Sequence, residues 1–419
     1  MKNQNILHVF ILAPFLFSSI ETDCKEERRR CVASQTNSTI DSTTTETVVR
    51  QPALVDKTNL MEDIQFHSEA ITTCLNHYPL QSLNTFHVPA FAAHYIRLNS
   101  LKDIEDFCTT VNVSQTNLYI LGGGSNTLFV SNFSGYLLHV QLLGIEVIRE
   151  TSHKVLVKAA AGVLWHDLVL FCIEKGYGGI ENLSLIPGTV GAAPVQNIGA
   201  YGVELNQVLD TIEAIELSTG QKVIFTSSEC GFGYRTSFFK TKWRHRYLIT
   251  SITLALHKEK KFSIEYEAIQ TMIAKMEINQ LSFKAISDAI IAIRKQKLPD
   301  PDILGNAGSF FQNPFISVGH YRWLKQQYPS VVAFRTPDEY SEQVKISAAW
   351  LIEAAGLKGL RKGNAGVYTL HALILVNCGG ASGKDIINLA TEIIQKVKTQ
   401  FNITLIPEVN IVGEGDAIK

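Results

Sequence analysis

The sequence lacks the residue spacings that usually mark metal sites. Its seven cysteines include no C-x-x-C pair, and its twelve histidines form no H-E-x-x-H motif. Both spacings are typical of zinc sites, and the first is also typical of dithiol redox centres. No metal site is therefore expected.

An excess of charge of either sign is also missing. The 419 residues include 38 Lys and Arg against 39 Asp and Glu, and the isoelectric point is near 6.9. Binding to a nucleic-acid backbone needs a positive surface that displaces counterions. Nucleic acid is therefore not an expected partner. The proportions of hydrophobic (46%) and charged (18%) residues are those of a folded protein.

No apolar run reaches the roughly 20 residues that a membrane-spanning helix requires. The longest N-terminal run, residues 6–20, is interrupted by His8 and Pro14, and a Ser/Thr-rich stretch follows it at 34–47. This segment is equally compatible with a targeting or anchoring device and with a dispensable extension. If residues 6–20 did insert into a membrane, the basic residues that follow them would keep the downstream chain in the cytoplasm. We therefore expect a cytoplasmic protein. A membrane is a partner only if residues 6–20 act as an anchor.

After this extension, short apolar runs alternate with a few amphipathic patterns, as in α+β or α/β proteins. The patterns predict a strand at 118–121, a helix around 164–172 and a hairpin formed by 212–217 and 222–225. They also predict helices around 286–293, 346–352 and 386–397, the last with Ser382 as its N-cap.

The predicted strand at 118–121 runs directly into Gly122-Gly123-Gly124-Ser125-Asn126. Three residues without side chains let backbone amides approach an anion closely, so the loop suits a pyrophosphate. A Rossmann fingerprint would need a third glycine at Thr127 and a following helix, and the sequence has neither. On its own, the loop is equally well explained as a glycine turn between two strands.

A second stretch, residues 187–202, reads PGTVGAAPVQNIGAYG. Its glycines, alanines and prolines leave little apolar bulk for a core, and a long loop of this kind is usually functional. We therefore expect its backbone to contact a flat ligand.

Three side chains further along suggest chemistry, although each also has an ordinary explanation. Arg235, among aromatic residues and glycines, could hold a carboxylate, but a surface arginine is the commoner case. Ser309 stands on a glycine turn without a G-x-S-x-G elbow or an evident histidine base, which fits a proton donor at least as well as a nucleophile. Glu408 stands in an apolar strand-like stretch, where a carboxylate is costly unless it is paired, catalytic or turned to solvent.

Six motifs in this order resemble the type I UDP-N-acetylenolpyruvoylglucosamine reductases (MurB), flavoenzymes of peptidoglycan precursor synthesis. The likeness runs from about residue 84 to residue 413. The motifs are GGGSN (122–126), ENLSLIPGTVGAAPVQNIGAYG (181–202), CGFGYRTSFFK (230–240), KLPDP (297–301), GNAGSFFQNP (305–314) and PEV (407–409).

The resemblance implies an α+β fold like that of the vanillyl-alcohol-oxidase flavoproteins, with two α+β subdomains around FAD and a separate substrate-binding domain. The implied boundaries are an extension at 1–78, an FAD-binding domain at 79–258 split near 148, a substrate-binding domain at 259–398, and a C-terminal segment at 399–419 that returns to the active site. The implied FAD contacts are Gly122, Gly123, Gly124, Ser125, Asn126, Gly188, Gly191, Ala192, Val195, Ile198 and Gly199.

The resemblance also implies the reaction. NADPH reduces FAD, and the flavin then passes a hydride to C3 of UDP-N-acetylglucosamine enolpyruvate, giving UDP-N-acetylmuramate. Arg235 and Glu408 would polarise the substrate carboxylate, and Ser309 would protonate C2. The residues implied to bind the substrate are Tyr266, Lys297, Asn313 and Gln196. We expect a monomer.

Some positions depart from the family pattern. Ala192 and Ala193 replace serines near the flavin, Phe334 replaces a tyrosine that contacts substrate, and Asn410 replaces a basic residue; Tyr340 could take the place of the missing tyrosine. Two other functions stay open at this point: a different FAD oxidoreductase of the same fold, such as an alcohol or sugar oxidase, and a non-catalytic flavin-binding protein.

Overall fold

The computed structural model describes residues 73–334 and 342–413. The chain divides into two compact units, Met1–Gln65 and Phe66–Lys419, and all described residues belong to the second. The predicted N-terminal segment at 6–20 and Tyr340 lie outside the described residues. Over the described ranges, no helix combines the length and the apolar character needed to cross a bilayer.

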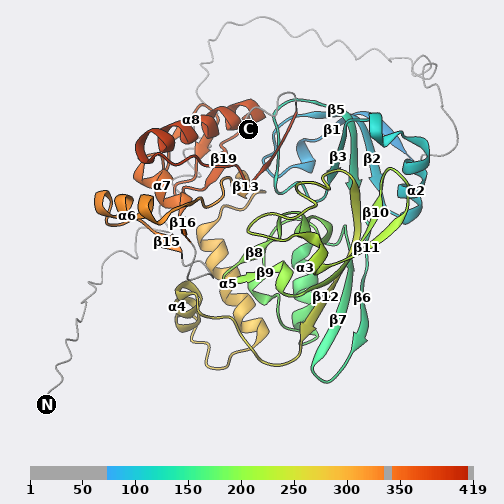
Figure 1. The fold of residues 1–419 in the computed structure, drawn as a ribbon, viewed down its shortest axis with the longest axis horizontal. Helices are drawn as coiled ribbons and strands as arrows, with labels where there is room; N and C mark the ends of the chain where they lie inside the picture. The colour runs from blue at the N-terminus through green and yellow to red at the C-terminus, as the bar shows by residue number, and fades with distance from the viewer. Residues whose placement is uncertain (1–72, 335–341, 414–419) are drawn as a thin grey trace, which may run out of the picture. The chain divides into compact units, whose positions relative to one another are not determined.

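The first sheet of the second unit contains four strands in the order β1-β2-β5-β3 (Figure 1). β1 pairs antiparallel with β2, whereas β2, β5 and β3 run parallel. The helix α2 (Leu101–Thr110) connects β2 to the next strand and begins at a capping box formed by Ser100 and Asp103. The strand bounds are β1 (Cys74–Pro79), β2 (Phe91–Leu98), β3 (Leu118–Leu121) and β5 (Phe133–Val140).

The second sheet is antiparallel, with the order β11-β10-β12-β7-β6. The helix α3 (Trp165–Glu174) packs against it, because Trp165, Leu168 and Cys172 share one buried cluster with Val157 and Ile252. The helix and the hairpin that the sequence predicts here are confirmed. The strand bounds are β6 (Ile145–Glu150), β7 (Lys154–Ala160), β10 (Leu209–Glu216), β11 (Lys222–Thr226) and β12 (Tyr247–His257).

The C-terminal half of the unit is richer in helix. Its four-stranded sheet has the order β13-β19-β18-β17, and a three-stranded sheet has the order β14-β16-β15. The helix α8 begins after Ser382, whose hydroxyl and Asp385 form a capping box, so the predicted cap is confirmed. The bounds are α4 (Glu267–Lys275), α5 (Phe283–Lys297), β13 (Gly305–Ser309), β14 (Phe315–Ser317), α6 (Val318–Gln327), β15 (Ala333–Phe334), β16 (Gln343–Ile346), α7 (Ala348–Ala354), β17 (Arg361–Lys362), β18 (Ala365–Val367), β19 (Ile374–Asn377) and α8 (Gly383–Phe401).

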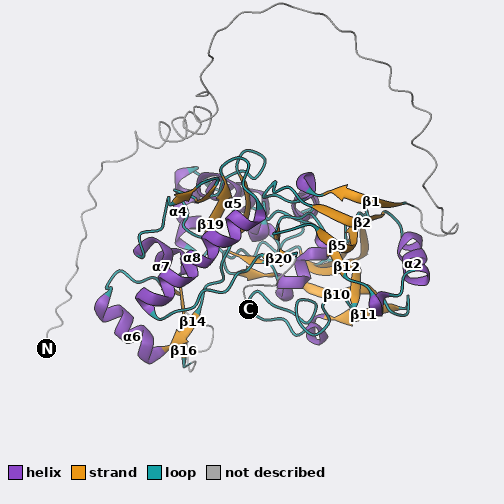
Figure 2. Ribbon diagram, turned by 90° about the horizontal axis from the view of Figure 1, so that it is seen from above, coloured by secondary structure: helices purple, strands orange, loops and turns teal. Residues whose placement is uncertain are grey.

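One short pairing brings the end of the chain back to the first sheet region. The strand β20 (Asn410–Val412) runs parallel to β4 (Thr127–Phe129), immediately after the predicted pyrophosphate loop. In Figure 2, β20 lies between the helices α7 and α8 and the strands β10 and β12. Glu408 therefore precedes this strand, and the prediction that it lies inside a strand is wrong. The mixture of helices and sheets confirms the predicted α+β class.

Candidate cofactor and active site

Residues 122–126 form the connection between β3 and β4, and their packing requires glycine. A Cβ atom at Gly122 would lie 2.5 Å from the Thr189 hydroxyl oxygen, and one at Gly124 would overlap the Leu83 carbonyl oxygen. Gly124 also has a φ of 64°, a conformation that glycine adopts without strain. The absence of side chains is therefore a structural requirement of this loop.

The glycine loop faces the second glycine-rich stretch. A Cβ at Gly123 would lie 3.0 Å from the Cα of Gly188. The stretch itself is not a simple loop, because residues Val190–Gln196 form a short 3-10 helix that contains Pro194. It continues into β8 (Gly199–Ala200) and β9 (Val203–Glu204).

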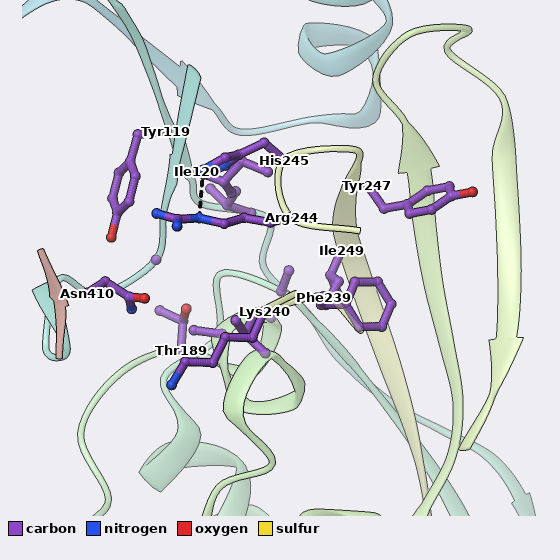
Figure 3. Close-up of a pocket in the computed structure, with 16 residues that line it drawn as sticks. Tyr119, Ile120, Thr189, Phe239, Lys240, Arg244, His245, Tyr247, Ile249 and Asn410 are labelled. Carbon is purple, nitrogen blue, oxygen red and sulfur yellow. Dashed lines mark hydrogen bonds between the residues drawn. The ribbon is translucent and has the colours of Figure 1, made fainter. Parts of the chain in front are cut away.

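A cavity extends between these two segments. Most of the predicted cofactor residues line one part of it: Gly122, Gly123, Gly124, Ser125, Asn126, Gly188, Ala192, Val195 and Ile198. An adjoining part is lined by Gly191 and again by Gly122, Ala192 and Val195 (Figure 3). Gly199 does not line either part of the cavity. Its carbonyl oxygen instead accepts a hydrogen bond of 2.6 Å from the Arg235 guanidinium.

The cavity fits a bound pyrophosphate. Within the described residues, the amides of Gly123, Gly124 and Ser125 donate to no protein acceptor. The hydroxyl oxygen of Thr189 is buried beside them and also has no partner there. A buried hydroxyl without a partner is rare in folded proteins, so a ligand with several acceptor oxygens would complete this site, pairing with the hydroxyl and with the free amides beside it. The residues present thus match what the pyrophosphate of FAD needs.

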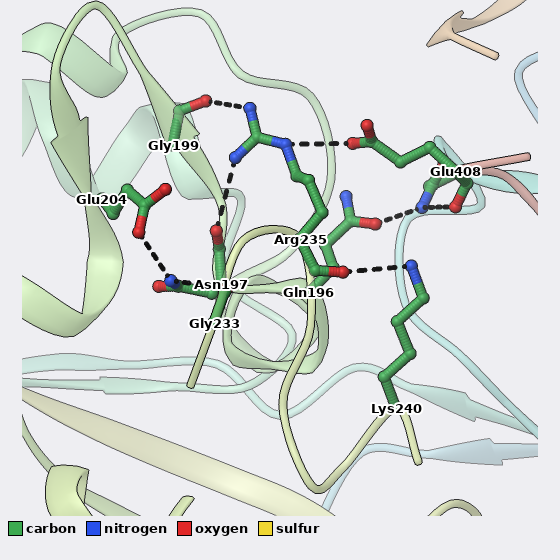
Figure 4. Close-up of polar contacts among 9 residues, drawn as sticks. Gln196, Asn197, Gly199, Glu204, Gly233, Arg235, Lys240 and Glu408 are labelled. Carbon is green, nitrogen blue, oxygen red and sulfur yellow. Dashed lines mark hydrogen bonds and ion pairs between the residues drawn. The ribbon is translucent and has the colours of Figure 1, made fainter. Parts of the chain in front are cut away.

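Beside the cavity, Arg235 and Glu408 form a largely buried ion pair. The Nε of Arg235 lies 3.3 Å from Oε1 of Glu408, and the two side chains are 20% and 13% exposed (Figure 4). The other guanidinium nitrogens donate to the carbonyl oxygens of Gly199 and Asn197. Arg235 has a φ of 54°, which is unusual for a residue with a side chain. Neither residue is the ordinary surface group that its local sequence would also allow.

The electrostatic environment of Glu408 combines two opposing effects. Burial raises the pKa of Glu408, while the nearby charges of Arg235 and Lys240 lower it. The ammonium of Lys240 donates to the Arg235 carbonyl oxygen at 3.3 Å, and burial lowers the pKa of this lysine. The glutamate therefore keeps its proton to a higher pH than an exposed glutamate does.

Ser309 is the last residue of β13 and follows Gly308, which has a φ of 68°. The next residue, Phe310, accepts a hydrogen bond of 2.7 Å at its carbonyl oxygen from the amide of Glu408. The backbone therefore places Ser309 next to the segment that carries Glu408. The hydroxyl is exposed and, in the part of the chain that the structure describes, makes no hydrogen bond to Arg235 or Glu408.

Of the four predicted substrate residues, Gln196 lines the cavity and the other three lie outside its lining. The side-chain oxygen of Gln196 accepts a 2.6 Å hydrogen bond from Asn126, so Gln196 belongs to the cavity lining. Asn313 accepts from the Ala348 amide at the start of α7. Tyr266 precedes α4 and Lys297 ends α5, and both side chains are exposed.

Besides Thr189, two other residues with contacts near the site, Lys240 and Asn410, were not among the predicted contacts. Lys240 lines both parts of the cavity and influences Glu408; its only sequence signal is its place at the end of the CGFGYRTSFFK motif. Asn410, which replaces a basic residue of the family pattern, donates two hydrogen bonds of 3.0 Å, from its amide and its side chain, to the Asn126 carbonyl oxygen. It thereby joins β20 to the glycine loop.

Comparisons with known proteins agree with this geometry. Residues 299–412 match the family described as UDP-N-acetylenolpyruvoylglucosamine reductase, C-terminal domain, and residues 92–225 match the FAD binding domain. UDP-N-acetylenolpyruvoylglucosamine reductase of Amoebophilus asiaticus is 47% identical over 334 residues, which cover 80% of this chain and 98% of the relative. The reductase of Flavobacterium johnsoniae is 40% identical over 338 residues, which cover 80% of this chain and 99% of that relative.

A solved structure supports the fold. The crystal structure of UDP-N-acetylenolpyruvylglucosamine reductase (MurB) from Thermus caldophilus has a TM-score of 0.56 and 22% sequence identity to this chain. The aligned region covers 81% of this chain and 98% of the Thermus caldophilus chain.

Proposed function

The chain belongs to the UDP-N-acetylenolpyruvoylglucosamine reductase family, and from this premise we propose how its residues perform the reaction. The reaction is the NADPH-dependent reduction of UDP-N-acetylglucosamine enolpyruvate to UDP-N-acetylmuramate, a step in peptidoglycan precursor synthesis. The observation that carries the proposal is the buried pair of Arg235 and Glu408 beside a cavity lined by two glycine-rich segments.

When bound, FAD would supply the hydride chemistry that links NADPH to C3 of the enolpyruvyl group. The chain's contribution at the cofactor is to hold it. The free amides of Gly123, Gly124 and Ser125 and the unpartnered Thr189 hydroxyl bind the pyrophosphate. Residues of the 3-10 helix Val190–Gln196 line the same cavity and would form part of its wall beside the cofactor.

Arg235 and Glu408 act on the substrate carboxylate. Hydride addition at C3 moves negative charge onto that group, and a guanidinium fixed in place stabilises such charge without reorganising. Three of its nitrogens already have fixed partners, which hold its position. In the ion pair the Glu408 carboxylate faces the guanidinium, and because burial raises its pKa it can take up a proton and then donate a hydrogen bond to the developing enolate.

Ser309 delivers the proton to C2. Its alcohol is a weak acid, so its usefulness depends on being held next to a strongly basic enolate. The Phe310–Glu408 backbone hydrogen bond supports this placement, since it joins the β13 end to the segment that carries the glutamate. The exposure of the hydroxyl allows it to recover a proton from solvent.

The three proposed parts of the chain then have separate tasks. Residues 79–258 supply the glycine segments and Arg235, residues 259–398 supply Ser309 and the substrate contacts, and residues 399–419 supply Glu408. All of these groups come from one chain, which supports activity as a monomer. We infer a cytoplasmic enzyme, because NADPH and nucleotide-linked sugars are used there.

The test separates the two half-reactions. In Ser309→Ala, NADPH should bleach the flavin absorbance as fast as in the unmodified protein, whereas reoxidation by the enolpyruvyl substrate should slow by about 10²- to 10⁴-fold, since only that step uses the proton. Ser309→Cys keeps a donor and should recover part of the rate. Equal damage to both half-reactions would contradict the proton-donor role. Oxygen consumption with the enolpyruvyl group left unreduced would instead identify an oxidase.

A further inference from the structure

Lys345 lies beside Arg235 and has no part in the proposed reaction. It is the third residue of β16, and its partners on the neighbouring strands are Phe315 in β14 and Phe334 in β15. Its ammonium lies 4.6 Å from the centre of the Tyr234 ring and 5.5 Å from the centre of the Phe334 ring. The strand β16 thus brings a cation from the C-terminal half of the unit to the residue that precedes Arg235.

The surroundings of the Lys345 ammonium are aromatic rather than acidic. The side chain is half-buried, and no carboxylate in the part of the chain that the structure describes forms an ion pair with it. Burial lowers its pKa, the charge of Glu204 raises it, and the charge of Arg235 lowers it. Glu204 instead accepts a hydrogen bond of 2.9 Å from Asn197 (Figure 4). A half-buried cation with these contacts favours an anionic ligand.

Two positive charges lie around the Tyr234 ring. Cζ of Arg235 is 5.4 Å from the centre of this ring, and Nζ of Lys345 is 4.6 Å from it. Of the two, only Arg235 is paired with a carboxylate of the described chain, that of Glu408. Like charges held close together repel, so an anion that contacts both cations would stabilise this arrangement. The substrate of the proposed reaction has such a group in its enolpyruvyl carboxylate.

The substrate also contains a diphosphate, but the structure associates that group with a different lysine. Lys297 is the cation among the predicted substrate residues, and it ends α5. Its charge acts on His371, whereas the charges that act on Lys345 are those of Glu204 and Arg235. The carboxylate, which the proposed reaction places at Arg235, is therefore the group that Lys345 can contact.

We propose that Lys345 binds the enolpyruvyl carboxylate together with Arg235 and makes the site specific for sugar nucleotides that carry this carboxylate. The inference rests on the reaction of the proposed function. UDP-N-acetylglucosamine has the same sugar and the same diphosphate but no enolpyruvyl group, so it leaves the lysine without an anion. The contact therefore favours the substrate over this analogue.

The test compares the two sugar nucleotides as ligands of the oxidised, FAD-loaded protein, with calorimetry to measure binding without turnover. Lys345→Met keeps the apolar stem of the side chain but removes its charge. It should weaken binding of the enolpyruvyl substrate by about 10- to 100-fold, the effect of losing a charge-assisted contact, and binding of UDP-N-acetylglucosamine by less than about threefold. Lys345→Arg keeps a cation and should recover part of the affinity. Equal losses for the two ligands, or no loss for the substrate, would overturn the proposal.

Lys242→Met is the matched control. Lys242 also lies over two rings, 3.5 Å from the centre of Phe238 and 5.1 Å from the centre of Trp243, but it lines neither part of the cavity. This variant should bind both sugar nucleotides as the unmodified protein does. A selective loss of substrate affinity in the control would contradict the proposal, because it would show that the effect does not need a cation beside Arg235.

Two further results separate ligand binding from a structural role and from the proposed function. In Lys345→Met, the NADPH concentration that half-saturates flavin reduction should change by less than about threefold, because NADPH has a diphosphate but no carboxylate. A loss for NADPH as large as that for the substrate would indicate a distorted pocket and overturn the proposal. If the unmodified protein binds neither sugar nucleotide, the proposed function fails as well, whereas normal substrate binding by Lys345→Met refutes this proposal alone.

Discussion

The Arg235–Glu408 pair joins two residues that are far apart in the sequence and places both charges where solvent has little access. Removing one member of such a pair leaves the other charge buried without compensation. The arginine also depends on a backbone conformation that residues with a side chain seldom adopt. The geometry of this pair is therefore sensitive to changes in any of the segments that support it.

Replacing Glu408 by Gln removes the acid while keeping the shape of the side chain. FAD binding and flavin reduction by NADPH should be retained, because neither uses the carboxyl group. Reduction of the enolpyruvyl substrate should slow by about 10²- to 10⁴-fold. Stopped-flow absorbance of the flavin measures both steps, and an unchanged second step would show that Glu408 has no part in the reaction.

For single residues, the sequence predicts which side chains are candidates for chemistry better than it predicts which side chains contact one another. Arg235 and Glu408 were each compatible with an ordinary surface position, and only their order within the family motifs suggested a common site. The contribution of Asn410 was not predicted, because its two hydrogen bonds depend on the pairing of β20 with β4. A residue's local sequence contains no information about such a distant partner.

Among the elements, those with a clear period or cap were predictable. The helix α8 has an apolar face and a Ser382 cap, and the β10–β11 hairpin has a Ser-Thr-Gly turn. The 3-10 helix Val190–Gln196 and the three-residue strand β20 were not predicted. A short helix containing proline and a strand of this length are too brief to show a hydrophobic period.

The glycine loop between β3 and β4 allows a direct test of whether this element needs glycine. Gly122→Ala would place a methyl group 2.5 Å from the Thr189 hydroxyl oxygen. The loop or the 3-10 helix must then move, so FAD affinity should fall by about tenfold or more and the free energy of unfolding by about 1–3 kcal/mol. Titration with FAD and thermal unfolding measure these two quantities.

Gly319→Ala in α6 provides the control. The added methyl group has ample room there, with its nearest neighbour 4.0 Å away, and alanine favours a helix over glycine by up to about 1 kcal/mol. This variant should keep its FAD affinity and gain slightly in stability. A Gly122→Ala variant that behaved like the control would show that the loop does not need glycine.

The stability of the whole described unit should depend on two partly buried histidines, His139 and His245. Burial, together with a nearby arginine, lowers the pKa of both His139 and His245 to about 4. In the unfolded chain these groups titrate near 6.5, so between about pH 6.5 and 4 the unfolded state binds protons that the folded state does not. Stability should therefore decrease as the pH falls through this window.

Thermal unfolding from pH 7.5 to 4.5 measures this dependence. His139 accepts or donates a 2.7 Å hydrogen bond with the Tyr95 hydroxyl, and His139→Gln preserves a polar partner without the titration. The variant should lose less stability than the unmodified protein as the pH falls, by up to about 2–3 kcal/mol at the acidic end. Parallel curves for the two proteins would assign the pH dependence to other groups.

The parallel pairing of β20 with β4 has a consequence for how the enzyme is made. Translation produces Gly122–Asn126 early, but the carboxylate that faces Arg235 and the asparagine that secures this loop emerge only within the last dozen residues. A nascent polypeptide can assemble its sheets and helices while it is still being synthesised and nevertheless lack a complete catalytic centre. A premature stop codon just after α8 would therefore yield a product that contains the sequence of every described helix but has no working chemistry.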